Sequence, residues 1–161
     1  MSKYFTINEL CKSASHPELA QKPKENSVEH SNLLALMAQL DAIREKFGKP
    51  IYISSGYRPK ALNDAVGGAK NSLHTRAAAA DIYSKDGYED NVNILRAVLD
   101  SGVIIDELIA EYPKFDKNGS LISCNWVHYA FLDGKIQKKP MYFDGKSYKP
   151  LKIENNYNFK K

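Results

Sequence analysis

The sequence predicts an α+β domain with a largely antiparallel sheet. Two segments with helical spacing of apolar residues occur early and in the middle of the chain, and short strand-like runs lie between them. The second half adds turn signals that are typical of β-hairpins. Helices interleaved with strands and followed by hairpins point to the α+β class.

The chain has 161 residues, which fits the usual length of one domain. We expect a single domain over residues 1–161. Within it, an N-terminal helical turn and loop (1–25) precede the core (26–139), and a basic extension (140–161) follows.

The first long helix is predicted over residues 27–47, because apolar residues recur there at three- and four-residue spacings. Ser27 or Asn26 can cap its start, and Gly48 supplies the stop. The β-branched run at 51–53 then predicts a buried strand. The apolar helix face consists of Leu33, Leu36, Met37, Leu40, Ile43 and Phe47.

Shorter elements flank this helix. Residues 5–10 predict a helical turn, since Thr6 and Glu9 have the spacing of a capping box. Residues 13–24 contain two prolines and predict a loop.

The stretch after Arg58, residues 59–72, contains a Gly-Gly pair and predicts a long irregular loop, which is usually functional. A strand is predicted from Asp81, and a second amphipathic helix over 88–101 ends at Gly102. Its inward-facing residues are Val92, Leu95, Val98 and Leu99.

The remaining segments read as strands and turns. Residues 103–112 mix β-branched residues with acids and are interpreted as a strand, and residues 116–119 form a turn. Residues 121–132 predict another strand, and Asp133-Gly134 predicts a reverse turn into a final strand.

Composition restricts the class of protein. Apolar residues make up 43% of the chain, but no run approaches the ~20 residues that span a bilayer, so we expect a soluble protein with no membrane partner. The N-terminus has no pattern of a secretion signal, so we expect synthesis in the cytoplasm. Cys11 and Cys124 are too few for a disulfide framework or a paired zinc cluster, and we interpret both as reduced thiols.

The net charge of +4 comes largely from the C-terminal quarter. This basic end indicates either attraction to a polyanion, such as teichoic acid or nucleic acid, or a solvated tail. Its lysines are Lys135, Lys138, Lys139, Lys146, Lys149, Lys152, Lys160 and Lys161.

Two histidines and an aspartate are candidate metal ligands. His74 and Asp81 lie in the segment SLHTRAAAADI, and His128 lies in NWVHYAF. Imidazole and carboxylate groups suit zinc, and three protein ligands plus one water are typical of a catalytic site. From composition alone, a surface pair of His and Asp is the more frequent alternative.

The residues around these ligands resemble the metal-binding segments of the zinc D-Ala-D-Ala carboxypeptidase family. Its relatives include the VanX dipeptidases, phage L-alanyl-D-glutamate endolysins and the Hedgehog signalling domain. The resemblance runs from about Phe5 to Phe131, and it is densest from Ser54 to Asp81 and at the later W-V-H. It implies a Hedgehog/DD-peptidase-like fold with one zinc site.

The resemblance also implies roles for single residues. His74, Asp81 and His128 would bind Zn²⁺, and Arg58 would stabilise an oxyanion or bind a substrate carboxylate. Residues expected to bind substrate or to orient the ligands are Ser72, Asn63, Trp126 and Tyr57. A structural salt bridge is the alternative role for Arg58, and Ser72 is not expected to be a nucleophile.

The general base departs from the pattern of the family. Many relatives carry an acid three residues before the last histidine, where this chain has Asn125. Glu111 is our candidate for the base, followed by Asp106 or Glu107, and the alternative is that Glu111 is a solvated strand residue. Phage and prophage relatives share such a D-x-L-I-x-E segment.

A second departure is Ala77 and Ala78, where relatives have Gly and often Glu. If the loop needs a positive φ at Ala77, alanine costs about 1 kcal/mol relative to glycine.

These features predict a monomeric peptidase that acts on peptidoglycan stem peptides, as a carboxypeptidase or an endopeptidase, after phage-type release. One alternative is a catalytically silent zinc module that binds wall peptides or a protein. Another is nucleic-acid binding through C-terminal aromatic residues between lysines, although we expect no nucleic-acid partner. These aromatic residues are Tyr142, Phe143, Tyr148, Tyr157 and Phe159.

Overall fold

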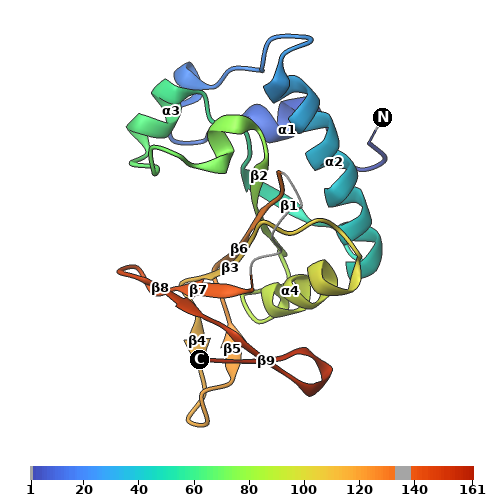
Figure 1. Ribbon diagram of the computed structural model, residues 1–161, viewed down its shortest axis with the longest axis vertical. Helices are drawn as coiled ribbons and strands as arrows, with labels where there is room; N and C mark the ends of the chain where they lie inside the picture. The colour runs from blue at the N-terminus through green and yellow to red at the C-terminus, as the bar shows by residue number, and fades with distance from the viewer. Residues whose placement is uncertain (1, 133–138) are drawn as a thin grey trace.

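A computed structural model describes residues 2–132 and 139–161 of the chain (Figure 1). A six-stranded sheet has the strand order β1-β2-β6-β3-β7-β8. All of its neighbouring strands pair antiparallel except β3 and β7, which are parallel. The predicted α+β class with a largely antiparallel sheet is therefore confirmed.

The strands of this sheet are β1 (Tyr52–Ser55), β2 (Ala79–Tyr83), β6 (Trp126–Ala130), β3 (Glu107–Glu111), β7 (Met141–Phe143) and β8 (Tyr148–Pro150). Two small hairpins pair β4 (Lys114–Phe115) with β5 (Leu121–Ser123) and β9 (Lys152–Glu154) with β10 (Asn158–Lys160). The helices are α1 (Ile7–Cys11), α2 (Val28–Phe47), α3 (Lys60–Ala65) and α4 (Asp90–Asp100). The described part of the chain also contains the 3₁₀ turns η1 (Pro17–Leu19), η2 (Leu73–Arg76) and η3 (Asn155–Tyr157).

The predicted helix caps are present. Thr6 and Glu9 form the capping box of α1, the Ser27 hydroxyl accepts a hydrogen bond from the backbone of His30 at the start of α2, and Gly48 ends α2 with a φ of 77°. Apart from Phe47, which is half-buried, the predicted apolar residues of α2 are all buried. Local spacing therefore predicted these elements correctly.

Helices α2 and α4 pack against each other, and α4 also packs on β3 and β6. Figure 1 shows α2 and α4 along one side of the molecule, with α3 and the turn between β7 and β8 on the other side. Within residues 2–132 and 139–161, no helix combines the length and the apolar character that crossing a membrane requires.

The prediction of an irregular stretch over 59–72 is wrong at its start, where α3 forms. Pro59 stands directly before the helix, where its lack of an N–H costs no helical hydrogen bond. Leu62 is buried and anchors the helix, while Lys60 and Asp64 form an ion pair one turn apart on its exposed face.

The predicted strand over 121–132 is interrupted at Cys124 and Asn125. The buried Asn91 side chain of α4 donates hydrogen bonds to the carbonyl oxygens of both residues, at 2.8 and 2.9 Å. These carbonyls are therefore satisfied outside a strand ladder, and β5 and β6 join different sheets.

Two other predicted strand features differ or lie outside the described residues. The strand predicted over 103–112 is confined to Glu107–Glu111. The predicted reverse turn at Asp133-Gly134 lies outside the described residues.

The C-terminal segment contributes to the sheet and to the core. Strand β7 lies between β3 and β8, and Leu151 and Phe159 are buried. The solvated-tail interpretation is therefore wrong for these residues, because a parallel ladder with β3 and burial of apolar side chains hold them in place.

Strand register separates a core face from an open face of the sheet. Because side chains alternate along a strand, Val127 and Tyr129 of β6 are buried on the helix side, whereas Trp126 and His128 lie on the opposite face. On this open face a first row of paired residues consists of Asp81, His128, Ile109 and Met141. A second row consists of Trp126, Glu111, Phe143 and Tyr148.

Candidate metal centre

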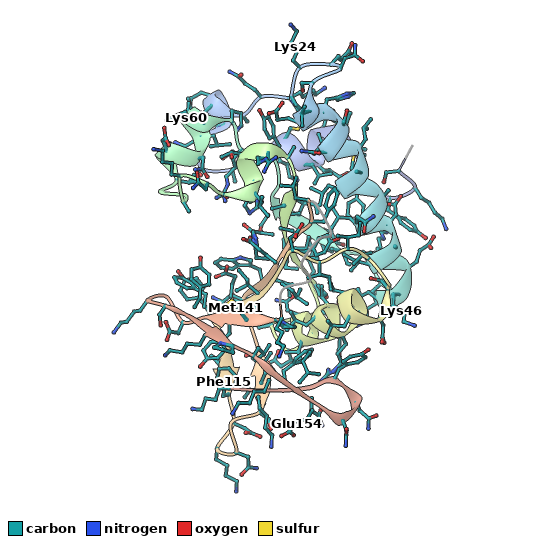
Figure 2. All side chains as sticks on the ribbon, viewed as in Figure 1. Lys24, Lys46, Lys60, Phe115, Met141 and Glu154 are labelled. Atoms are coloured by element: carbon teal, nitrogen blue, oxygen red, sulfur yellow. The ribbon has the colours of Figure 1, made fainter. Side chains whose placement is uncertain are left out.

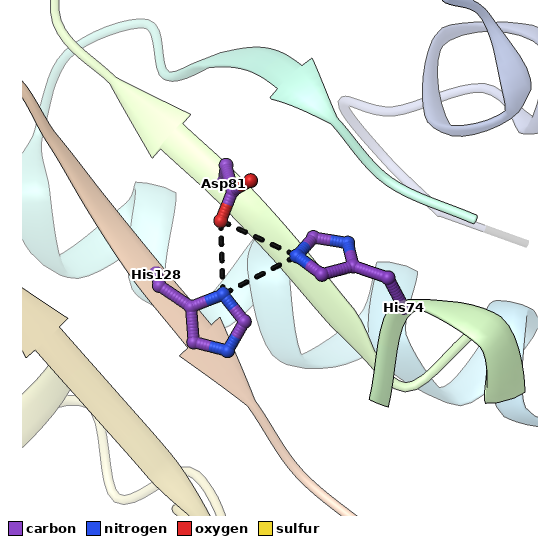
Figure 3. Close-up of side chains that lie close together, drawn as sticks. All are labelled: His74, Asp81 and His128. Atoms are coloured by element: carbon purple, nitrogen blue, oxygen red, sulfur yellow. Dashed lines mark hydrogen bonds and ion pairs between the residues drawn. The ribbon is translucent and has the colours of Figure 1, made fainter. Parts of the chain in front are cut away.

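Three elements bring His74, Asp81 and His128 together on the open face of the sheet (Figure 3). His74 comes from η2, Asp81 from β2 and His128 from β6. His74 Nε2 lies 3.3 Å from His128 Nδ1 and 3.3 Å from Asp81 Oδ1, and His128 Nδ1 lies 2.9 Å from Asp81 Oδ1. Bonds of about 2.0–2.1 Å in a tetrahedral zinc site place ligand atoms about 3.3 Å apart, so this set fits zinc.

The ring of His74 is fixed by its second nitrogen. Nδ1 donates to the carbonyl oxygen of Gly56 at 2.7 Å, which leaves Nε2 with the lone pair that a metal requires. Ser72 caps the turn that carries His74, since its hydroxyl accepts from the His74 backbone N–H. Burial lowers the pKa of His74, which favours the neutral imidazole that binds metal.

His128 lies between two carboxylates. Its Nδ1 faces Asp81 and its Nε2 lies 2.9 Å from Glu107 Oε2. Burial by itself lowers the pKa of His128, but the hydrogen bonds to Asp81 and Glu107 outweigh it and raise the pKa to about 9. Glu107 thus fixes the orientation of the His128 ring, in the way that a carboxylate does behind a metal-binding histidine.

The carboxylate of Asp81 stays ionised in this cluster. Burial on its own raises the pKa of Asp81, yet the charges and hydrogen bonds of His74 and His128 hold it below its usual range. An ionised carboxylate and a neutral imidazole are the forms that ligate zinc.

Glu111 lines the same cavity as the three ligand candidates. Glu111 and Ile109 lie two residues apart in β3 and therefore on the same, open face of the sheet, and Ile109 pairs with His128 of β6. Only 9% of Glu111 is exposed, and burial raises its pKa to about 7, although the charge of His128 opposes the rise. A carboxyl group with a pKa near 7 suits general acid–base chemistry at neutral pH.

The other acidic candidates take different positions. Glu107 contacts His128, as described above, and lies on the opposite side of Ile109 from Glu111. Asp106 is not among the residues that line the cavity. Asn125 is also absent from the lining; its backbone N–H donates to the Glu111 carbonyl, and its own carbonyl accepts from the Asn91 side chain.

Arg58 lines the cavity next to η2. Its backbone N–H donates to the His74 carbonyl at 3.0 Å, and its Nη2 donates to the Ser72 hydroxyl at 3.3 Å. The Nε atom is buried and has no hydrogen-bond partner among the described residues. Burial lowers the pKa of Arg58, but a guanidinium keeps its charge in proteins, so a donor remains available to an anionic ligand.

Asn63 acts through the loop at the cavity rim. Its side chain is buried and donates to the Ala69 carbonyl at 3.0 Å. A Cβ atom at Gly68 would lie 2.1 Å from Asn63 Oδ1, so this close approach requires glycine. The Gly67–Ala69 segment that lines the cavity is held in this way.

Tyr57 and Trp126, both expected to contact substrate, differ in position. Trp126 lines the cavity, whereas Tyr57 does not and instead packs against the hydrophobic core. The Tyr57 backbone N–H donates to the carbonyl of Leu10, which ties the segment after β1 to α1.

The cavity has a volume of about 730 Å³, within the size range of small-molecule sites. In Figure 2, α3 with Lys60 lies above it and β7 with Met141 lies below it. Three further aromatic side chains line it, namely Tyr112, Phe143 and Tyr148. The sequence indicated Phe143 and Tyr148 only as residues that could stack on nucleic-acid bases, and it gave no signal for Tyr112.

The backbone at Ala77 is left-handed, with a φ of 54°. Its N–H donates to the His74 carbonyl, and the Ala78 N–H donates to the Leu73 carbonyl, so the turn closes directly behind His74. The positive φ considered for this residue is present, and the alanine side chain is fully buried.

Comparison with known proteins identifies a family and a relative. A family model described as Peptidase M15 matches residues 3–115. A zinc D-Ala-D-Ala carboxypeptidase of Streptomyces albus G is 43% identical over 53 residues, which are 32% of this chain and 21% of that protein. The matched part of this chain thus spans about a fifth of the relative's length.

Proposed function

The chain belongs to the peptidase M15 family, and we propose that it is a zinc-dependent peptidase that hydrolyses an amide bond of peptidoglycan stem peptides. The observation that carries the proposal is the set of distances of 2.9 and 3.3 Å among His74, Asp81 and His128. The name of the Streptomyces relative, a zinc D-Ala-D-Ala carboxypeptidase, supports the substrate class.

His74 Nε2, an oxygen of Asp81 and His128 Nδ1 would hold the zinc. When bound, zinc supplies a Lewis acid that polarises the scissile carbonyl and lowers the pKa of the attacking water. Glu107 keeps the His128 ring in the orientation that points Nδ1 at the site.

Glu111 is proposed as the general base. A nearby cation favours its ionised form, so at neutral pH the carboxylate accepts a proton from the attacking water and then donates it to the leaving amine. Its burial in the cavity wall supports this role, since a pKa near neutrality allows both transfers. This proton transfer does not need the acid that many relatives carry at the position of Asn125.

Arg58 is proposed to bind the developing oxyanion or a substrate carboxylate. The guanidinium lines the cavity and has an unsatisfied buried Nε, so an incoming anion finds a donor without breaking a bond within the protein.

The first test is zinc content together with release of fragments from purified peptidoglycan. We expect about one zinc per chain and hydrolysis in the wild type, loss of both in His128→Ala, and loss of hydrolysis with zinc retained in Glu111→Gln. The exposed Glu25→Gln variant is the matched control and should behave as wild type. Zinc without hydrolysis of any wall preparation would favour the silent zinc module, and absence of zinc would contradict the proposal.

Carboxypeptidase and endopeptidase action are separated by the products. Mass spectrometry of the digest shows free D-alanine in the first case and a cut stem peptide in the second. We also propose phage-type release as the natural setting, because of the D-x-L-I-x-E segment. Co-expression with a holin should then lyse bacteria, and the His128→Ala variant should not.

A further inference from the structure

Four aromatic side chains form one wall of the cavity beside the metal centre, and we name them the aromatic row: Tyr112, Trp126, Phe143 and Tyr148. Trp126, Phe143 and Tyr148 share the second row of the open face with Glu111. The ring centres of Tyr112 lie 5.3 Å from Trp126 and 5.8 Å from Phe143, and Phe143 lies 4.6 Å from Tyr148. The rings are therefore continuous from β6 to β8.

Tyr112 joins the row through an unusual backbone conformation. In a regular strand the residue after Glu111 would point to the other face of the sheet, but Tyr112 has a φ of 51°. Its N–H donates to the Phe143 carbonyl at 2.9 Å, and a Cβ atom added at Gly145 would lie 3.1 Å from its ring. A bulky residue held in the left-handed region beside a cavity indicates a function for the ring's position.

The row also keeps apolar surface in contact with water. Tyr112 is 43% exposed and Tyr148 is 57% exposed, although both pack against other aromatic rings. Exposed, contiguous apolar surface at the edge of a cavity marks a place where a ligand packs.

The flat shape of the row selects among the parts of a peptidoglycan substrate. Stem peptides carry small methyl groups, carboxylates and amines, which present no broad apolar face. The pyranose ring of the attached amino sugar does present such a face, formed by its axial C–H groups, and can lie flat on an aromatic ring.

Spacing along the sheet agrees with a sugar in this position. From strand spacing and rise, Trp126 lies about 7 Å, Phe143 about 12 Å and Tyr148 about 16 Å from His128. If the bond after the first stem residue is cut at the metal, one residue and the lactyl ether separate the sugar from it, roughly 7 Å. A cut between the last two residues would place the sugar at most roughly 17 Å away, so the row covers the distances at which the sugar lies in either case.

We propose that the aromatic row is a subsite for the amino-sugar ring that carries the stem peptide. The proposal rests on the peptidase function proposed above. It assigns to the C-terminal segment, through Phe143 and Tyr148, a part of substrate selection.

The kinetic test compares an N-acetylmuramoyl stem peptide with the free stem peptide of the same sequence. We expect kcat/KM to be about tenfold higher for the sugar-bearing substrate, the size that one or two aromatic contacts supply. Tyr148→Ala should remove most of this preference, and Tyr148→Phe, which keeps the aromatic ring, should retain it. Tyr88→Ala alters an exposed tyrosine outside the cavity and should have the wild-type ratio of the two kcat/KM values. An unchanged ratio in Tyr148→Ala would overturn the proposal.

A binding test separates the subsite from catalysis. Trp126 is the single tryptophan of the chain, so its fluorescence reports directly on the row. Titration of the zinc-loaded protein with the N-acetylglucosaminyl-N-acetylmuramic acid disaccharide should give a saturable change, with a Kd at least fivefold weaker in Tyr148→Ala. Sugar binding without peptide hydrolysis would refute the peptidase function alone, whereas hydrolysis without sugar binding or preference would refute the subsite alone.

Discussion

Replacement of Glu111 by Gln should stabilise the metal-free protein above neutral pH while it abolishes hydrolysis. Burial raises the pKa of Glu111 from 4.5 to about 7. The folded protein thus binds a proton more tightly than the unfolded chain, and the free energy of unfolding falls as pH rises from about 4.5 to about 7. Above this window the ionised, desolvated carboxylate is a destabilising group.

The size of this effect follows from the pKa. A rise from 4.5 to about 7 corresponds to at most about 3 kcal/mol at pH 8, and contact with water in the cavity reduces this to about 2 kcal/mol. Glutamine does not ionise, so Glu111→Gln should exceed wild type by about 2 kcal/mol at pH 8 and by little at pH 4. In a domain of this size, the midpoint temperature should rise by about 4–8 °C.

The assay is denaturant unfolding of chelator-treated protein at pH 4, 6 and 8. The titrations of His74 and His128 occur in both proteins, so the difference between variant and wild type isolates Glu111. Glu25→Gln, at an exposed position, should show no pH-dependent difference. A difference that is the same at pH 4 and pH 8 would refute the reasoning, and with it the argument that Glu111 is tuned for proton transfer.

Three further outcomes are expected. Glu107→Gln should weaken zinc affinity about 10–100-fold in a chelator competition, because His128 loses the carboxylate that orients its ring. Wild-type zinc affinity in this variant would contradict the orienting role of Glu107. Ala77→Val should lower the free energy of unfolding by more than about 2 kcal/mol, since a β-branched residue is strained at positive φ and the site is buried. Ala77→Gly should change the free energy of unfolding by less than about 1 kcal/mol. Equal effects of the two substitutions in denaturant unfolding would argue against strain at this residue. Deletion of residues 140–161 should prevent folding, because it removes strand β7, which pairs with β3, and the buried Leu151 and Phe159. The measurement is thermal unfolding, which should lose its cooperative transition. A truncated protein that still unfolds cooperatively would contradict a structural role of the C-terminal segment.

The sequence alone was sufficient for features that depend on neighbouring residues. Helix α2 was predicted from the spacing of its apolar residues and its caps, because hydrogen bonds and side-chain contacts in a helix join residues three or four positions apart. The resemblance of local segments to the carboxypeptidase family likewise indicated His74, Asp81 and His128 as the zinc set, and the glycine that relatives carry at the position of Ala77 led us to consider a positive φ there.

Only the tertiary structure decided the features that depend on strand pairing. Glu107 and Glu111 were both candidates for the base, and the register of β3 against β6 decides between them: both line the cavity, but Glu107 contacts His128. The parallel pairing of β7 with β3, which brings Phe143 to the site, joins segments about thirty residues apart that no local signal connects. Register is set by burial of one sheet face over its whole width, and this is a property of the assembled core and not of any single segment.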